Sequence, residues 1–294
     1  MAHTAPRDRP TAAVTDLRKA TITDLLADVA ARLATSLDHS TIVRKRRTLG
    51  IATDRNTWVR IEARPHATAT AQGQTNNGIE TSALLHGIAK PRWHQAVSWL
   101  DDTTDTLWRA DECDLVTGPA ATPIGYPLTE PTLTPHWWTT LNTSLDNLAR
   151  QSITRRATPD TQPITQALVT DTIEGVFPGA LETTIDDTRA WVPAHADLVW
   201  SNLTAPDCQI LDWEDLGLAP RGLDAATLWT NSLMIPALAD RVFGERQADL
   251  ETRSGKLMAL FTCCKDLTSP GFATAPAYAP TTAHATRLIA ELTH

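Results

Sequence analysis

Apolar residues recur along the chain with two different periods. In residues 15–37 they recur at helical spacing, which predicts an amphipathic helix. Residues 41–65 alternate instead and are rich in β-branched side chains, which predicts two strands joined by a turn at the sequence TDRN. Helical spacing returns in 78–88, and two more strands are predicted on either side of the polar turn DTTD, at 94–102 and 106–116. The first part of the chain is therefore strand-rich.

A Pro-rich stretch follows and then the pattern changes. Residues 118–135 cannot continue a sheet, so they are interpreted as a connector. Beyond Pro135 the chain is mainly helical, with predicted helices at 136–151, 164–177, 224–243, 253–267 and 283–292. The predicted fold class is α+β and bilobal, with a small strand-rich lobe and a larger helical lobe. The predicted boundaries are 1–112 for the first lobe, 113–135 for the hinge and connector, and 136–294 for the second lobe.

Composition narrows the classes of function. A chain of 294 residues can bury one large core or two modest ones. The net charge of −8 argues against nucleic-acid binding, which needs a basic face. No apolar run is long enough to span a membrane and no secretory signal is visible, so we expect a cytoplasmic protein without membrane contact. The four cysteines lack a C-x-x-C pair and are expected to be reduced thiols. Oligomeric state stays open.

Polar residues of types that can take part in catalysis or metal binding lie close together between short apolar segments. His195, Asp197 and Asn202 fit the pattern H-x-D-x-x-x-x-N, in which phosphoryl-transfer enzymes use the aspartate as a base and the asparagine as a Mg²⁺ ligand. Asp212 supplies a second carboxylate from the segment QILDW. A short hairpin would bring Asn202 and Asp212 to one face. The alternatives are ordinary turn and cap residues, or a zinc site at His195 and Asp197 that lacks a third ligand.

These residues resemble those of a known family. HADLVWSNL resembles the catalytic loop HGDLHPGNxL of the aminoglycoside phosphotransferase and choline kinase superfamily, and LDWEDLGLAPRGLDAATL resembles its metal-binding segment. The resemblance is strong over about residues 190–230, and over 40–115 it concerns layout alone. It implies a protein-kinase-like fold. It also implies roles for five residues: Asp197 as the base, Asn202 and Asp212 as Mg²⁺ ligands, and His195 and Asp224 as supports of the loop.

The chain also departs from the family pattern. Ala196 replaces a glycine, and Val199-Trp200-Ser201 replaces His-Pro-Gly. Arg60 stands where the family has a phosphate-binding lysine, with Glu80 as the expected ion-pair partner, although an ordinary salt bridge is the equal alternative. No Gly-rich loop is visible, because Gly50 is isolated.

The predicted reaction is transfer of the ATP γ-phosphoryl group to a hydroxyl of a small metabolite or antibiotic. We expect ATP and Mg²⁺ between the lobes, with adenine against the connector near Asp111, Glu112 and Cys113. Acceptor contacts are expected from Trp200, Glu214 and Asp215. The alternative is a catalytically weak kinase-like module for ligand binding or regulation, favoured by Arg60. A third reading, nucleotidyl transfer, would use the same metal ligands.

Overall fold

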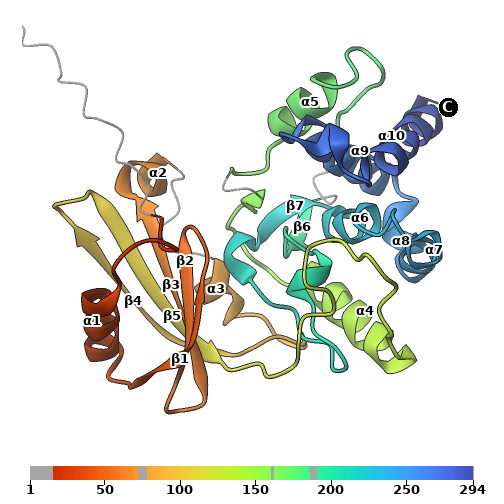
Figure 1. Cartoon of the computed structure of the whole chain (residues 1–294). Coiled ribbons are helices and arrows are strands. Elements are labelled where there is room, and N and C mark those ends of the chain that lie inside the picture. Colours follow the sequence, from red (N-terminus) through yellow and green to blue (C-terminus); the bar gives the residue numbers. More distant parts are fainter. Residues whose placement is uncertain (1–15, 72–77, 160–161, 186–190, 294) are drawn as a thin grey trace, which may run out of the picture. The chain divides into compact units, whose positions relative to one another are not determined.

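The strand-rich part of the chain forms a five-stranded antiparallel sheet (Figure 1). The computed structural model describes residues 16–71, 78–159, 162–185 and 191–293. The sheet has the order β1-β2-β3-β5-β4, and its strands are Leu37–Arg44 (β1), Thr48–Thr53 (β2), Thr57–Pro65 (β3), Trp93–Asp101 (β4) and Thr106–Asp114 (β5). The turn predicted at TDRN joins β2 and β3. Strand β1 is one more than the alternation predicts, and it begins at Leu37, the last residue of the predicted first helix.

Helix α1 (Thr23–Leu33) covers one face of this sheet. It is shorter than predicted, since Ala34 takes the left-handed conformation (φ 50°) and ends it. Leu26, Val29 and Leu33 of the helix pack on the inward residues of β2, β3 and β5, which are Leu49, Ile51, Val59, Ile61, Ala63 and Ala110. Each large side chain so buried stabilises the fold by about 1.5–3 kcal/mol. This apolar cluster fixes which face of every strand is turned towards α1.

The rest of the chain is mainly helical, as predicted. Its helices are α3 (Gly78–Ser82), α4 (Pro135–Ala149), α5 (Gln166–Glu174), α6 (Leu223–Thr230), α7 (Pro236–Glu245), α8 (Gln247–Leu250), α9 (Arg253–Thr268) and α10 (Tyr278–Thr293). The helix predicted at 224–243 is two helices, since α6 ends at Thr230 and Pro236 opens α7 at a position that suits proline. Two short strands, β6 (Trp191–Ala194) and β7 (Gly217–Pro220), pair antiparallel within this part.

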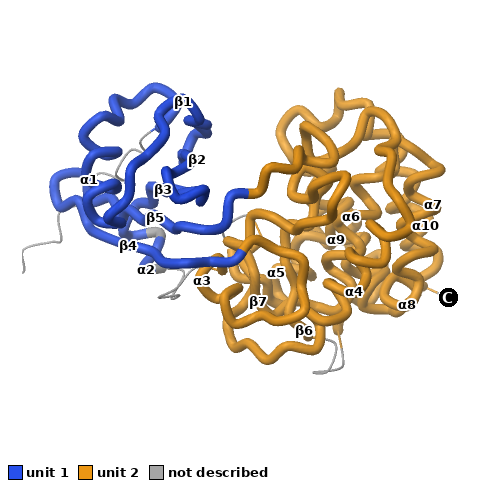
Figure 2. Tube along the Cα trace, turned by 90° about the horizontal axis from the view of Figure 1, so that it is seen from below, with its two compact units in different colours: residues 1–75, 92–115 blue, residues 76–91, 116–294 orange. Residues whose placement is uncertain are grey.

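Contacts divide the chain into two compact units (Figure 2). Unit 1 comprises the described residues of 1–75 and 92–115, including α2 (His66–Ala71), and unit 2 those of 76–91 and 116–294. The segment 76–91, which carries α3, therefore clusters with the helical unit, whereas the sequence-based division places it in 1–112. The α+β fold with a strand-rich and a helical part is confirmed.

Two further expectations concern thiols and membranes. All four cysteines are free thiols, and three of them, Cys208, Cys263 and Cys264, are buried. Within the described ranges, no helix combines the length and the apolar character needed to cross a bilayer.

Candidate functional site

The predicted catalytic and metal-binding residues of unit 2 lie in one loop that β6 and β7 hold at its two ends. Ala194 pairs with Gly217 at the mouth of this loop. Inside it, the Thr204 N–H donates to Gln209 O (3.1 Å) and the Leu211 N–H donates to Asn202 O (2.8 Å). The expected hairpin is therefore present, and it places Asn202 beside the residue that precedes Asp212.

The side chain of Asn202 is bonded to Asp197. Its amide Nδ2 donates to both the main-chain oxygen and the Oδ2 of Asp197, at 2.9 Å each. These bonds fix the position of the Asp197 carboxylate relative to the turn Trp200–Asn202. They also leave Oδ1 as the atom with which Asn202 could hold a cation.

His195 is completely buried and bonded within the loop. Its Nε2 lies 2.7 Å from Leu211 O, and its Nδ1 lies 3.3 Å from the Asp197 nitrogen. Since a backbone N–H can only donate, Nδ1 is the acceptor, and Nε2 carries the proton that goes to Leu211. The ring also stands edge-on to Trp213, with the centroids 4.8 Å apart. These contacts favour a structural role for His195 over proton transfer.

Asp224 binds the start of the same loop from α6. Its two oxygens accept the N–H groups of His195 and Ala196, at 2.8 Å each. Burial raises the pKa of Asp224, and its polar contacts with His195 and Ala196 oppose that rise. Ala196 has φ 72°, a left-handed conformation that favours glycine, the residue found at this position in the family pattern. The two bonds thus hold a backbone conformation that Ala196 alone would not prefer.

Carboxylates crowd the second half of the loop. Burial, together with the charges of Glu214, Asp197 and Asp212, raises the pKa of Asp215 to about 8. Asp215 Oδ1 accepts a hydrogen bond from the Thr158 hydroxyl (2.9 Å), a partner that carries no sequence signal. Several negative charges therefore act on one another here, and this arrangement favours a cation.

Helix α3 packs directly on this acidic turn. A Cβ atom at Gly78 would lie 2.0 Å from the main-chain oxygen of Trp213, so only glycine allows the approach. Glu80, two residues further along α3, is consequently carried by the same unit as Asp212. Arg60, its predicted partner, belongs to unit 1, and the pairing of the two stays a prediction.

The ligand set fits Mg²⁺ better than a transition metal. Among the residues that the structure describes, no group of three or more His, Cys, Asp or Glu side chains could hold a metal ion. This finding opposes the zinc alternative, which needs three or four protein ligands. Mg²⁺ is commonly held by one or two protein oxygens, with phosphate and water oxygens completing the shell. Asn202 and Asp212 would be sufficient for that arrangement.

Trp200 does not occupy the position expected of an acceptor contact. It has no exposed surface, its Nε1 donates to the Ser232 hydroxyl (2.9 Å), and its ring stacks on Trp137 at 6.1 Å. The prediction that Trp200 forms a wall of the acceptor site is therefore wrong for this structure. Burial of an aromatic cluster with Trp137 and Trp138 outweighs the exposure expected of a loop residue.

In unit 1, Arg60 lies on β3 and pairs with a residue of the same strand. Its Nη1 is 3.1 Å from Glu62 Oε2, and Arg64 Nε is 2.7 Å from Glu62 Oε1. Burial alone would raise the pKa of Glu62, but the charges of Arg60 and Arg64 hold it below its ordinary value. Asp111 is the β5 partner of Arg60 in the register. This face of the sheet therefore carries alternating charges.

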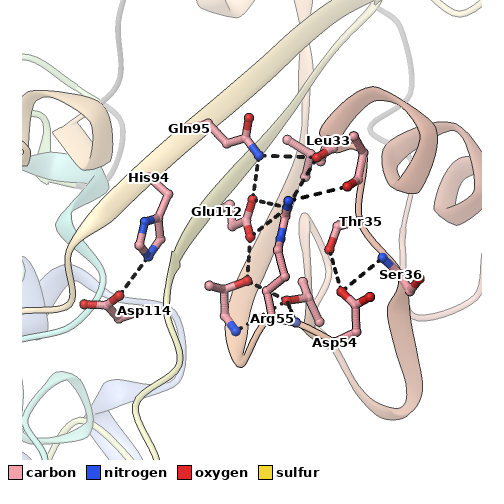
Figure 3. Close-up of polar contacts among 12 residues, drawn as sticks. Leu33, Thr35, Ser36, Asp54, Arg55, His94, Gln95, Glu112 and Asp114 are labelled. Carbon is pink, nitrogen blue, oxygen red and sulfur yellow. Dashed lines mark hydrogen bonds and ion pairs between the residues drawn. The ribbon is translucent and has the colours of Figure 1, made fainter.

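Asp111, Glu112 and Cys113 lie within β5 and not in a connector. Successive side chains of a strand point to opposite faces, so Glu112 is turned away from the face of Asp111 and Cys113. The Glu112 carboxylate is 2% exposed and accepts bonds from Arg55, Thr57 and Gln95 (Figure 3). A cofactor contact by the Glu112 side chain is therefore a wrong prediction.

The network around Glu112 joins α1 to the sheet. Arg55 Nη2 donates to the Leu33 oxygen at 3.3 Å and to Glu112 Oε2 at 2.9 Å, and Gln95 also donates to Leu33 (Figure 3). Leu33 ends α1, so these donors satisfy a carbonyl of its last turn. The role of Glu112 is structural.

Comparison with known proteins shows the fold. No protein-family model and no curated protein matches the chain. Among solved structures, aminoglycoside phosphotransferase APH(4)-Ia has a TM-score of 0.59 at 10% identity, covering 92% of this chain and 99% of that one. The GDP complex of aminoglycoside 2'-phosphotransferase-IIIa has 0.53 at 13%, covering 92% and 99%. Amicoumacin kinase hAmiN in complex with AMP-PNP, Ca²⁺ and Ami has a TM-score of 0.50 at 10% identity, covering 90% of this chain and 93% of that one. The predicted resemblance is confirmed for the kinase-like fold of these phosphotransferases.

Proposed function

We propose that the protein is a small-molecule kinase that transfers the γ-phosphoryl group of ATP to a hydroxyl of a metabolite or antibiotic. The observation that carries this proposal is the hairpin that bonds Asn202 to Asp197 and brings Asp212 beside them. The fold shared with phosphotransferases, and the nucleotides bound in two of the similar structures, support it.

Separate residues would take the proton of the acceptor hydroxyl and neutralise the charge of the phosphates. Asp197 Oδ1 or Oδ2 would accept the proton of the acceptor hydroxyl as its oxygen attacks the γ-phosphorus, and the bond from that phosphorus to the β,γ-bridging oxygen would break to release ADP. Mg²⁺, held by Asn202 and Asp212, would supply neutralisation of the phosphate charge. Asp224 and His195 hold the loop so that Asp197 keeps its position, and most of the catalytic effect would come from this positioning. Glu214 and Asp215 stay the proposed acceptor contacts. A cationic acceptor would favour the ionised form of Asp215, whose pKa is raised in part by its negative neighbours.

The test is calorimetric titration of ATP, with and without Mg²⁺, into wild type, Asp212→Asn and Asp197→Asn. We expect metal-dependent binding by the wild type and by Asp197→Asn, and loss of the metal dependence in Asp212→Asn. Turnover of Asp197→Asn should fall by about 10²–10⁴, the usual contribution of a general base. Normal turnover of Asp197→Asn would refute its assignment as the base.

The rival is a kinase-like module that binds a ligand without efficient catalysis. The observation in its favour is Arg60, an arginine in place of the family's lysine that is bonded to Glu62. A folded wild type that binds no ATP with Mg²⁺ would favour this rival, with Arg60 as the first residue to examine. The mass of the product separates nucleotidyl transfer, because the acceptor would then gain AMP instead of phosphate.

A further inference from the structure

The Pro-rich connector runs along the loop that carries Asp197. Main-chain hydrogen bonds join the two segments, from Ala121 N to Leu203 O (2.6 Å), from Ala205 N to Pro119 O (3.1 Å) and from Trp200 N to Gly125 O (3.1 Å). Pro123 and Pro127 restrict the backbone of the same stretch further, because proline fixes its own φ angle. The connector is therefore held at a fixed place against the loop.

Gly125 of the connector lies beside Val199 of the loop. A Cβ atom at Gly125 would lie 3.5 Å from the Cβ of Val199, which is an ordinary contact distance. The Val199 N–H donates to Asp197 O at 2.9 Å, so these two residues of the loop stay close together. Leu198 and Trp200 have no exposed surface, whereas Asp197 and Val199 are partly exposed. The connector therefore reaches the loop on the exposed side that Val199 shares with Asp197.

Residues on either side of Gly125 present apolar side chains to solvent. Ile124 is 39% exposed, Tyr126 36% and Leu128 68%. Single exposed apolar residues are normal on a protein surface, but a group of them on a segment with a fixed backbone is typical of a binding surface. Consecutive Cα atoms are about 3.8 Å apart, so Ile124 and Tyr126 flank the contact of Gly125 with the loop. A molecule that covers these side chains therefore lies beside Asp197.

We propose that Ile124 and Tyr126 form an apolar wall of the acceptor site, and that the acceptor carries an alkyl or aromatic group next to the hydroxyl that receives the phosphoryl group. This inference rests on the proposed function and names the class of acceptor. The aromatic contact expected of Trp200, which is buried, comes from Tyr126 instead. A tyrosine offers an apolar ring face with a polar hydroxyl at its end, which suits an acceptor that has both characters.

The test uses ethanol, butan-1-ol and hexan-1-ol as probes, because these alcohols share the hydroxyl and differ only in apolar length. The release of ADP from ATP·Mg²⁺ is measured as each alcohol is added to the full chain. An alcohol that occupies the acceptor site changes this release, upward as an acceptor or downward by excluding water. The concentration that gives half of the effect should fall about three- to fourfold for each added CH₂ group, because each group is buried against the wall.

Variants of the wall separate this site from general effects of alcohol. The half-effect concentration of hexan-1-ol should rise by about 5- to 100-fold in Tyr126→Ser, and by a smaller factor in Ile124→Ser. Tyr126→Phe keeps the ring and should resemble wild type. Tyr278→Ser is the matched control, since Tyr278 at the start of α10 is 39% exposed, and its response should equal that of wild type. Circular dichroism at the highest alcohol concentration checks that each protein remains folded.

The inference is overturned if no alcohol changes the release of ADP by the folded wild type, or if the half-effect concentration does not depend on chain length. It is also overturned if Tyr126→Ser and Ile124→Ser both respond as wild type does. In each of these cases wild type still releases ADP, so the proposed function stands. If the folded wild type releases no ADP from ATP·Mg²⁺, either to water or to any alcohol, the proposed function itself fails.

Discussion

The two hydrogen bonds to Asp224 provide a test of what holds the catalytic loop in place. Replacing Asp224 with alanine removes the acceptors of the His195 and Ala196 N–H groups, both in buried residues. Leaving one buried backbone donor unsatisfied costs about 1–3 kcal/mol, so two cost about 2–6 kcal/mol. Asp224→Asn keeps one acceptor oxygen and turns an NH₂ group towards the other donor, so about half of that loss is expected. Stabilities of 5–15 kcal/mol are typical, which makes either loss easy to detect.

Urea unfolding followed by far-ultraviolet circular dichroism measures these losses, and titration with ATP·Mg²⁺ measures the effect on the loop. We expect the free energy of unfolding to decrease in the order wild type, Asp224→Asn, Asp224→Ala. Affinity for nucleotide should fall in the same order, because Asn202 and Asp197 belong to the loop that Asp224 holds. Asp240→Asn, an exposed carboxylate on α7, is the control and should stay within about 0.5 kcal/mol of wild type.

The reasoning would be refuted by an Asp224→Ala protein as stable as the control. That outcome would mean that the two N–H groups find other acceptors when the carboxylate is absent. A stability loss without any change in nucleotide affinity would refute a narrower point. It would show that Asp224 contributes to the fold without fixing the geometry of Asp197 and Asn202.

Two predictions concern buried polar groups outside the candidate site. Glu112→Gln should lower the free energy of unfolding by about 1.5–3 kcal/mol, because the charge-assisted bond from Arg55 is lost. Its affinity for nucleotide should equal that of wild type, and a tenfold change in that affinity would contradict the structural role of Glu112. Burial, with the charge of Arg287, lowers the pKa of His284 to about 4. Between pH 6.5 and 4 the unfolded chain binds this proton and the folded chain does not. The free energy of unfolding should therefore decrease as the pH is lowered through this window, by up to about 3 kcal/mol. His284→Gln should lose that part of the pH dependence in urea titrations, whereas the exposed His39→Gln should keep it.

The candidate site of unit 2 could be predicted because its chemistry is contiguous in sequence. His195, Asp197 and Asn202 occupy a single loop, and the spacing to Asp212 is what a short hairpin requires. Thr158 could not be found in this way. It reaches Asp215 from a segment more than fifty residues earlier and has an ordinary turn composition. Contacts of this kind depend on packing, and no local pattern encodes them.

The errors in the prediction have identifiable physical causes. The predicted cofactor contact treats Asp111, Glu112 and Cys113 as one set, although a strand separates alternate residues onto opposite faces. The sequence itself predicts a strand at 106–116, and the separation of these three side chains onto two faces follows from that prediction. Trp200 is a different case, because a loop position predicts exposure. Its burial is explained by Trp137, Trp138 and the hydroxyl of Ser232, which all come from distant segments.

The ion pair of Arg60 with Glu62 changes how the missing lysine should be judged. A lysine that depends on a glutamate from a helix needs that helix in place before it can bind phosphate. Arg60 is held in part by Glu62, two residues further along its own strand, and Glu62 is held in turn by Arg64. A guanidinium keeps its charge and has five donors in a planar fork, which suits contacts with several oxygens at once. The replacement therefore preserves a positioned cation on this face of the sheet, so the ion pair with Glu62 weakens the argument that Arg60 provides for the rival.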